Sequence, residues 1–294
     1  MTRRGAIALA AVAPVLGACG GAASATPARH AQPTPRCPSP GLHLVQGGQL
    51  RVPDGAEPGR TPLLVVTIPG GGGDRTDRLG LGRAGARRGF AILYPTSVHG
   101  GFWTLNERQG TQDVADVTAL LDRIAPEDGG GCFDPDRVSI TGVSNGAGFA
   151  TRMACELPDL FAAVVPVAAG YRALDPCPAA ARESFLAIHG TADTVVPYRG
   201  KPPDFKGNVP RFTARWARRD GCATPPRRST PRRLVTRLTY RDCDGGRRVE
   251  LLRLTGTDHG WPGAGPPRPA HNPSGLDATT AVLSFAAAAR RPTG

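Results

Sequence analysis

The sequence predicts an α/β fold with a mostly parallel central sheet and helices on both faces. Three observations support this fold class: short apolar runs of strand length, amphipathic helical stretches between them, and a Gly-x-Ser-x-Gly pattern where a strand meets a helix. Strands that are apolar throughout belong inside a parallel sheet, because helices cover both of its faces.

Six runs are expected to form strands. Residues 63–68 (LLVVTI) are the clearest, since they are apolar without alternation, as a central strand buried on both faces requires. The other five runs cover residues 90–94, 138–141, 161–167, 185–188 and 249–254. Residues 234–240 are expected to pair with residues 249–254 as a hairpin around Asp244-Gly245-Gly246.

Three helices are expected between and after these strands. One helix is indicated by apolar residues at helical spacing, namely Val114, Val117, Leu120, Leu121 and Ile124. A second covers residues 147–155, directly after the Gly-x-Ser-x-Gly pattern, and an Ala-rich third covers residues 276–290.

The start of the chain predicts export. Arg3 and Arg4 precede an apolar run over residues 6–16, which is too short to anchor stably in a bilayer. The run ends in Leu-Gly-Ala-Cys, which is similar to a bacterial lipobox and predicts a lipoprotein signal peptide over residues 1–18 with lipid on Cys19. The alternative is ordinary secretory cleavage with Cys19 incidental. Residues 19–40 are expected to form a flexible tether and residues 41–294 one folded domain.

The seven cysteines fit an oxidising compartment, because six remain if Cys19 carries lipid. Cys222 and Cys243 flank an Arg-rich excursion and are expected to pair, as are Cys155 with Cys177 and Cys37 with Cys132. Six cysteines allow fifteen connectivities, so other pairings stay open. No Cys-x-x-Cys or Cys/His cluster is present in the sequence, so no metal site is expected.

The formal net charge of +12 raises the question of nucleic-acid binding. Apart from Lys201 and Lys206, the basic residues are scattered arginines, and the densest group, residues 211–248, lacks any known nucleic-acid motif. We therefore expect no nucleic-acid partner, and we interpret the charge as solvated surface.

Gly142-Val143-Ser144-Asn145-Gly146 is the motif with the clearest chemistry. Small residues on both sides of the serine allow a strained turn between strand and helix, and the helix amino terminus favours negative charge beside the hydroxyl. The alternative is an ordinary glycine-rich turn. A serine needs a histidine to accept its proton, so the motif predicts partners elsewhere in the chain.

Three histidines follow Ser144: His189, His259 and His271. His259 is expected to be the base because it comes directly after the strand at 249–254, whereas His189 is expected to be structural and His271 lies in a Pro-rich stretch. Asp193, which follows the strand at 185–188, is expected to orient His259; Asp258 is a secondary candidate.

Backbone amides are expected to form the oxyanion hole. One is the N–H of Asn145, and the other is that of Gly71, in the glycine run 70–73 after the first central strand. A phosphate-binding loop is the competing interpretation, but no Gly-Lys-Ser/Thr follows the glycines.

Together these motifs resemble the secreted poly(3-hydroxybutyrate) depolymerase and feruloyl esterase group of α/β-hydrolase carboxylesterases, as a bacterial lipoprotein member. The resemblance covers about residues 41–265 and is carried by FDPDRV at 133–138, SNGAG at 144–148, ACELPDLFAA at 154–163, HGTAD at 189–193 and DHGWPG at 258–263. It implies an α/β-hydrolase fold, a catalytic triad of Ser144, Asp193 and His259, and a tryptophan near the site at Trp103. Trp261 and Tyr198 are expected to line the substrate pocket as well. The group usually has His-Gly after the first strand, where this chain has Pro69-Gly70.

The function expected from these features is an extracytoplasmic serine esterase that needs no cofactor. Its substrates would be short-chain or aromatic carboxylic esters, either small or polymeric, hydrolysed through an acyl-enzyme. Its place would be the cell envelope, anchored by lipid to the outer side of the membrane, or the medium if it is secreted. The alternative is a non-catalytic envelope-binding lipoprotein that retains the scaffold.

Overall fold

The computed structural model describes residues 36–70, 77–97, 101–125, 131–171, 174, 177, 182–202, 207–263 and 271–291. All of these belong to one compact unit, Thr34–Gly294. The signal peptide, Cys19, most of the tether and Gly71 lie outside the described residues, so the expectations about them stay predictions.

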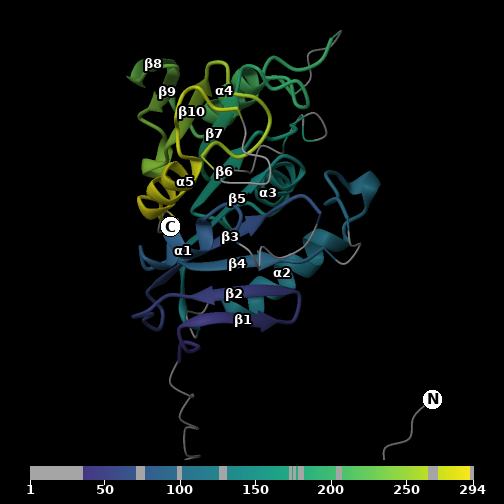
Figure 1. The fold of residues 1–294 in the computed structure, drawn as a ribbon, viewed down its shortest axis with the longest axis vertical. Helices are drawn as coiled ribbons and strands as arrows, with labels where there is room; N and C mark the ends of the chain where they lie inside the picture. The colour runs from purple at the N-terminus through teal and green to yellow at the C-terminus, as the bar shows by residue number, and fades with distance from the viewer. Residues whose placement is uncertain are drawn as a thin grey trace, which may run out of the picture. The chain divides into compact units, whose positions relative to one another are not determined.

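A ten-stranded sheet runs through this unit in the order β1-β2-β4-β3-β5-β6-β7-β10-β9-β8. Figure 1 shows the strands stacked in this order, from β1 at the bottom of the view to β8 at the top. The six central strands are parallel to one another, and an antiparallel pair extends the sheet at each end. Their bounds are β1 Gly41–Val45, β2 Gly48–Val52, β3 Thr61–Thr67, β4 Ala91–Pro95, β5 Phe133–Val143, β6 Ala163–Val167, β7 Ser184–Gly190, β8 Ala223–Arg232, β9 Val235–Arg241 and β10 Val249–Leu254.

Among the described residues, five α-helices cover the two faces of the sheet. Their bounds are α1 Leu81–Ala86, α2 Gln112–Ile124, α3 Asn145–Glu156, α4 Val209–Arg219 and α5 Ala278–Ala287. Alternate residues of each strand point to opposite faces. In β3, Leu63 and Val65 therefore join the core formed with α2, α3 and α4, while Leu64 and Val66 join the core formed with α1 and α5. This arrangement confirms the predicted fold class.

All six predicted strands are present, and the predicted hairpin is confirmed by the antiparallel pairing of β9 with β10. The three predicted helices correspond to α2, α3 and α5. Five further elements, β1, β2, β8, α1 and α4, were not predicted from the sequence. A short 3-10 helix, Asp244–Gly246, connects β9 to β10.

Three disulfides join the pairs expected from the sequence: Cys37 to Cys132, Cys155 to Cys177 and Cys222 to Cys243. The first attaches the chain at residue 37 to the start of β5, so the attachment begins before the predicted tether boundary at residue 40. Among the helices that the structure describes, none is both long enough and apolar enough to cross a bilayer.

Candidate active site

Ser144 lies in a sharp turn between β5 and α3. Its backbone angles are φ 54° and ψ −122°, outside the regions that residues with a side chain normally adopt. The Ser144 amide donates to the Val167 carbonyl at the end of β6, at 3.0 Å, and this bond helps to hold the turn in place. Strain of this kind is common at functional positions, because the surrounding structure must maintain it.

The two glycines of the motif let β3 approach this turn. A Cβ on Gly142 or on Gly146 would overlap the backbone carbonyl oxygen of Thr67, the last residue of β3. The Thr67 hydroxyl lies 2.7 Å from the Gly146 carbonyl oxygen and 3.1 Å from that of Thr141. Thr67 therefore packs directly against the turn, a contact that the sequence analysis did not anticipate.

A continuous chain of hydrogen bonds connects Ser144, His259 and Asp193. His259 Nε2 lies 2.8 Å from Ser144 Oγ, and His259 Nδ1 lies 2.8 Å from Asp193 Oδ2. An ionised Asp193 accepts the Nδ1 proton, and Nε2 is then free to accept the proton of the serine hydroxyl. The structure thus brings together all three residues of the predicted triad, from loops after β5, β7 and β10.

Asp193 is held in its ionised form by the groups around it. Its Oδ1 accepts hydrogen bonds from the backbone amides of Val195 and Val196, at 3.0 and 2.7 Å. Burial of the carboxyl alone would raise its pKa, but hydrogen bonds from His189, His259 and the Val196 amide outweigh burial and hold the pKa far below its usual range. The carboxylate is therefore a permanent acceptor for the His259 ring.

The remaining candidates lie outside the triad. His189 is fully buried, with Nε2 2.8 Å from the Val196 carbonyl oxygen and 3.3 Å from Asp193 Oδ2, so it supports the acidic loop. The carbonyl of the exposed His271 accepts from the Asp258 amide. The described hydrogen bonds of His259 go to Asp193 and Ser144, and Asp258 is absent from them.

The loops that carry Asp193 and His259 are bound to each other by their backbones. The Ala192 amide donates to the Thr257 carbonyl at 3.0 Å, and the Gly256 amide donates to the Thr191 hydroxyl at 3.0 Å. A Cβ on Gly190 would overlap the Thr257 carbonyl oxygen, so only glycine allows the two loops to meet this closely. This double attachment fixes the imidazole relative to its carboxylate.

Asn145 is the first residue of α3, so its amide has no acceptor within the helix and can serve an oxyanion. Its role in the oxyanion hole, like that of Gly71, stays a prediction.

The three aromatic residues predicted near the substrate are almost fully buried. The exposed fractions are 2% for Trp103, 4% for Trp261 and 8% for Tyr198. The Trp261 indole N–H donates to the Thr279 hydroxyl at 3.0 Å, and the Trp103 indole N–H donates to the Ile68 carbonyl at 2.8 Å. Their rings are packed in the core, so they present little surface to a substrate. Contact of their remaining exposed atoms with substrate stays a prediction.

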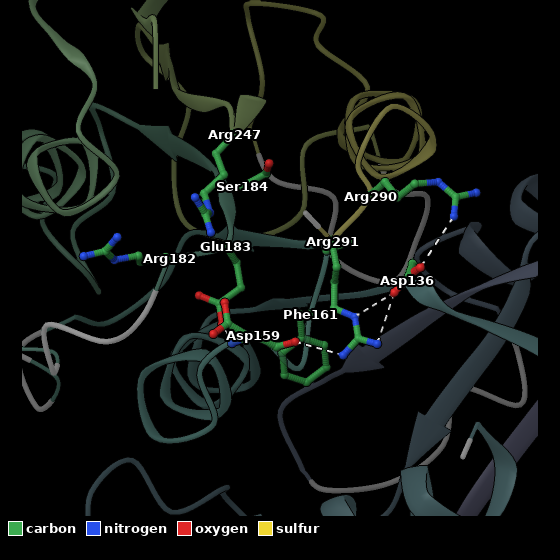
Figure 2. Close-up of a pocket in the computed structure, with 10 residues that line it drawn as sticks. Asp136, Asp159, Phe161, Arg182, Glu183, Ser184, Arg247, Arg290 and Arg291 are labelled. Carbon is green, nitrogen blue, oxygen red and sulfur yellow. Dashed lines mark hydrogen bonds and ion pairs between the residues drawn. The ribbon is translucent and has the colours of Figure 1, made fainter. Parts of the chain in front are cut away.

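A pocket of about 430 Å³ lies at the opposite edge of the sheet from the triad. It is formed at the amino ends of β6, β7 and β10, whereas Asp193 and His259 follow the carboxyl ends of β7 and β10. Figure 2 shows Arg291 between Asp136 and the Asp159 carbonyl, with Glu183 beside Asp159. The lining residues are Asp136, Asp159, Phe161, Ala162, Arg182, Glu183, Ser184, Arg247, Arg290 and Arg291. Within the described part of the chain, no group of three or more His, Cys, Asp or Glu side chains could hold a metal ion.

Comparison with known proteins places this geometry in a family. The model of the prolyl oligopeptidase family matches residues 96–175, a stretch that includes Ser144. Feruloyl esterase B of Piromyces equi is 33% identical over 140 residues, which cover 44% of this chain and 26% of that protein. The chain thus matches only about a quarter of the length of this relative.

A putative esterase, NocK, of Nocardia uniformis subsp. tsuyamanensis is 30% identical over 260 residues, which cover 78% of this chain and 72% of that protein. The solved structure of an acetyl xylan esterase from Aspergillus awamori shares the fold, with a TM-score of 0.54 at 19% identity over 81% of this chain and 93% of that one. The similarity to NocK extends over most of both proteins, and the serine turn lies at the carboxyl edge of a mostly parallel sheet. This chain therefore belongs to the α/β-hydrolase esterase family.

Proposed function

We propose that this chain is an extracytoplasmic serine esterase that hydrolyses short-chain or aromatic carboxylic esters through an acyl-enzyme. The observation that carries the proposal is the unbroken hydrogen-bond chain from Ser144 through His259 to a buried, ionised Asp193. A non-catalytic binding protein has no need for a strained serine held 2.8 Å from an imidazole, so this geometry favours the enzyme over the envelope-binding alternative.

In the acylation step, Ser144 Oγ forms a bond to the ester carbonyl carbon as His259 Nε2 accepts the hydroxyl proton. Negative charge develops on the carbonyl oxygen, where the Asn145 amide and a second amide from the glycine run 70–73 are proposed to stabilise it. The bond to the alcohol oxygen then breaks, and His259 returns the proton to the leaving alcohol.

In the deacylation step, His259 accepts a proton from water, whose oxygen attacks the acyl carbon. The bond to Ser144 Oγ breaks, the carboxylic acid departs, and the serine recovers its proton. Asp193 remains ionised throughout and stabilises the imidazolium that forms in each step. The cycle uses only these side chains, backbone amides and water.

The substrate class rests on the resemblance to feruloyl esterases and on the surface beside the triad. Phe102 is 74% exposed and precedes Trp103, while Val195 is 59% exposed and follows the Asp193 turn. Trp103, the neighbour of Phe102, pairs with Asn145, and the Val195 amide donates to Asp193, so both exposed side chains belong to segments bonded to the site. We propose that they, rather than the buried aromatic rings, contact an acyl or aromatic group. Contact with Phe102 would favour esters that carry a ring.

A panel of esters tests this proposal. We expect p-nitrophenyl acetate or butyrate and methyl ferulate to give kcat/KM values at least about 10-fold above that of p-nitrophenyl decanoate, because a short site binds long chains poorly in the transition state. A proline-containing dipeptide anilide belongs in the panel because of the prolyl oligopeptidase match. Faster cleavage of the anilide than of every ester would make the chain a peptidase, and preference for decanoate would make it a lipase.

We also propose that Cys19 carries lipid and anchors the protein to the outer side of the cell membrane. Three disulfides support an oxidising compartment. Intact mass spectrometry of the membrane fraction is expected to show a diacylglyceryl mass that is lost in Cys19→Ser. Wild-type protein without added mass would leave ordinary secretion as the explanation.

A further inference from the structure

Trp103 is tied to the residue that follows the nucleophile by two hydrogen bonds. Its backbone amide donates to Asn145 Oδ1 at 2.8 Å, and the Asn145 Nδ2 donates back to the Trp103 carbonyl at 3.0 Å. The side-chain amide of Asn145 thus pairs with both backbone groups of one residue in a distant segment, as a neighbouring β-strand would. The pairing restricts the rotation of Asn145 about its Cα–Cβ bond and fixes its backbone relative to Trp103.

The Trp103 indole makes a third attachment, to the end of β3. Its Nε1 donates to the Ile68 carbonyl at 2.8 Å, and its ring stacks on Phe149 of α3 with 4.4 Å between ring centroids. Ile68 immediately precedes Pro69 and the glycine run 70–73 in the sequence. Trp103 therefore connects the start of α3 to the strand end from which the glycine run departs.

The segment around Trp103 is itself held by hydrogen bonds from two buried charged residues, Asp113 and Arg152. Asp113, 1% exposed, accepts from both the amide and the hydroxyl of Thr104, at 2.9 and 3.0 Å. Arg152 of α3, fully buried, donates to the Thr104 and Gly110 carbonyls at 3.1 and 2.9 Å. Trp103 is thus a rigid attachment point for Asn145.

We propose that Trp103 and the side chain of Asn145 are positioning residues that aim the Asn145 amide at the oxyanion. This inference rests on the proposed esterase function, and it assigns to these side chains a role in the transition state that does not require contact with substrate. The Asn145 amide lies at the start of α3 directly after a strained residue and has no acceptor within the helix. Its peptide plane is held within the helix by the bond from the Gly148 amide to the Ser144 carbonyl, and the pairing with Trp103 is a second constraint on it. An oxyanion donor must lie within a few tenths of an ångström of its place, and a displacement of about 1 Å can cost about 100-fold in rate.

The competing interpretation is that Trp103 is an ordinary core residue. The chain offers a matched control, because Trp216 is also fully buried, donates from Nε1 to a backbone carbonyl, that of Glu183, at 2.9 Å, and stacks on Phe185 with 4.4 Å between centroids. Glu183 borders the pocket at the opposite edge of the sheet from the triad. Trp103→Phe and Trp216→Phe therefore delete the same kind of bond with the same kind of packing, but only the first acts near Ser144.

The experiment compares wild type with Trp103→Phe, Trp216→Phe and Asn145→Ala. For each protein it measures Tm and the kcat and KM for p-nitrophenyl acetate. It also measures the inhibition constant of a small boronic acid that mimics the tetrahedral intermediate. We expect Trp103→Phe to lower kcat about 10-fold and Asn145→Ala about 10- to 100-fold, with KM within about twofold. Binding of the boronic acid should weaken by the same factor by which kcat/KM falls. Trp216→Phe should lower Tm about as much as Trp103→Phe and keep kcat within twofold.

The proposal is overturned if Trp103→Phe or Asn145→Ala keeps wild-type kcat, or if their effect falls on KM alone. It is also overturned if both tryptophan variants lose kcat in proportion to their loss of Tm. If Trp103→Phe fails to fold, Asn145→Ala decides the question, since Asn145 is only partly buried and keeps its backbone amide in that variant. An inactive wild-type protein would refute the proposed function instead, so the two failures are distinguishable.

Discussion

At the scale of single residues, Asp193 is bonded to His259 Nδ1 at 2.8 Å and is the acid that we propose orients the catalytic base. Asp193→Asn should leave His259 with an amide partner that can favour the wrong tautomer, and we expect kcat to fall about 10³- to 10⁴-fold. The change should be visible in kcat for p-nitrophenyl acetate, with Tm measured in parallel.

Asp258→Asn is the matched control for this prediction. Asp258 adjoins His259 in the sequence, yet its Oδ1 is buried without a hydrogen-bond partner among the described residues, and the ring pairs with Asp193. We expect kcat within about threefold of wild type. A larger loss in Asp258→Asn than in Asp193→Asn would reverse the assignment of the acid.

The sequence could predict these residues because each carries a recognisable local pattern. Ser144 lies in a glycine-flanked turn, and Asp193 and His259 each follow a strand, in the order that the chemistry requires. The Trp103 contacts could not be predicted, because they join residues 42 and 35 positions apart and leave no periodic signal. For the same reason the sequence could not show that Trp103, Trp261 and Tyr198, which we expect near the substrate, are almost fully buried.

At the scale of elements, the Cys222–Cys243 disulfide joins the end of α4 to the connection between β9 and β10. Replacing both cysteines with serine should destabilise the fold by about 3 kcal/mol, since the bond closes a loop with a separation of 21 residues. Thermal and urea unfolding measure this loss. At 20 °C we expect kcat within about threefold of wild type, because β7 and β9 pair with β10 along its whole length.

The Cys155–Cys177 pair is a matched comparison, with a separation of 22 residues. The loop-entropy account predicts nearly equal destabilisation for the two double-serine variants. If the Cys222/Cys243 variant keeps its stability and loses turnover, the disulfide has a catalytic rather than a stabilising role.

The elements that the sequence predicted are those with strong hydrophobic patterns. β3 and β10 were found because their apolar runs match buried strands, whereas β8 contains Pro225, Pro226 and Pro231 among arginines and is mostly exposed at the sheet edge. Pairing with β9, more than its own composition, makes β8 a strand. α4 is different: its buried residues recur at helical spacing, so its pattern was present in the sequence and was overlooked.

At the scale of the whole molecule, the sequence could predict a parallel sheet but not the order of its strands. Strand order depends on which crossovers pack together, and that information is spread over the whole chain. The consequence for function is nevertheless simple. Because the central strands are parallel, the loops after β5, β7 and β10 meet at one edge, and residues 144, 193 and 259 come together there.

Two buried carboxyl groups, at the edge of the sheet opposite the triad, should make the stability of the fold depend on pH. Glu183 is 3% exposed, and burial raises its pKa from 4.5 to about 8; burial also raises the pKa of nearby Asp220 to about 7. The folded state therefore binds these protons more tightly than the unfolded state does. The contribution of Glu183 to stability is complete below about pH 4.5 and is lost as the pH rises through its folded pKa of about 8. That of Asp220 is complete below about pH 3.8 and is lost as the pH rises through about 7.

Glu183→Gln removes one of these titrating groups, so its Tm should fall less steeply than that of wild type between pH 5 and pH 8. In the free energy of unfolding, the pH slopes of the two proteins are expected to differ by up to about 1 kcal/mol per pH unit. Glu107→Gln, which alters an exposed carboxyl, should follow the wild-type curve. Parallel curves for Glu183→Gln and wild type would show that Glu183 does not titrate in this range.

The central claim is that Ser144 is the nucleophile of an esterase, and covalent labelling with a fluorophosphonate tests it most directly. The reagent phosphonylates a serine that a neighbouring imidazole activates. We expect one label on wild-type protein, located by mass spectrometry in the peptide that contains Ser144, with parallel loss of p-nitrophenyl acetate hydrolysis. Ser144→Ala should fold with the same Tm, take up no label and retain well under about 10% of turnover, since triad members act as a unit. Equal labelling of Ser144→Ala, or a label on another serine, would contradict the account.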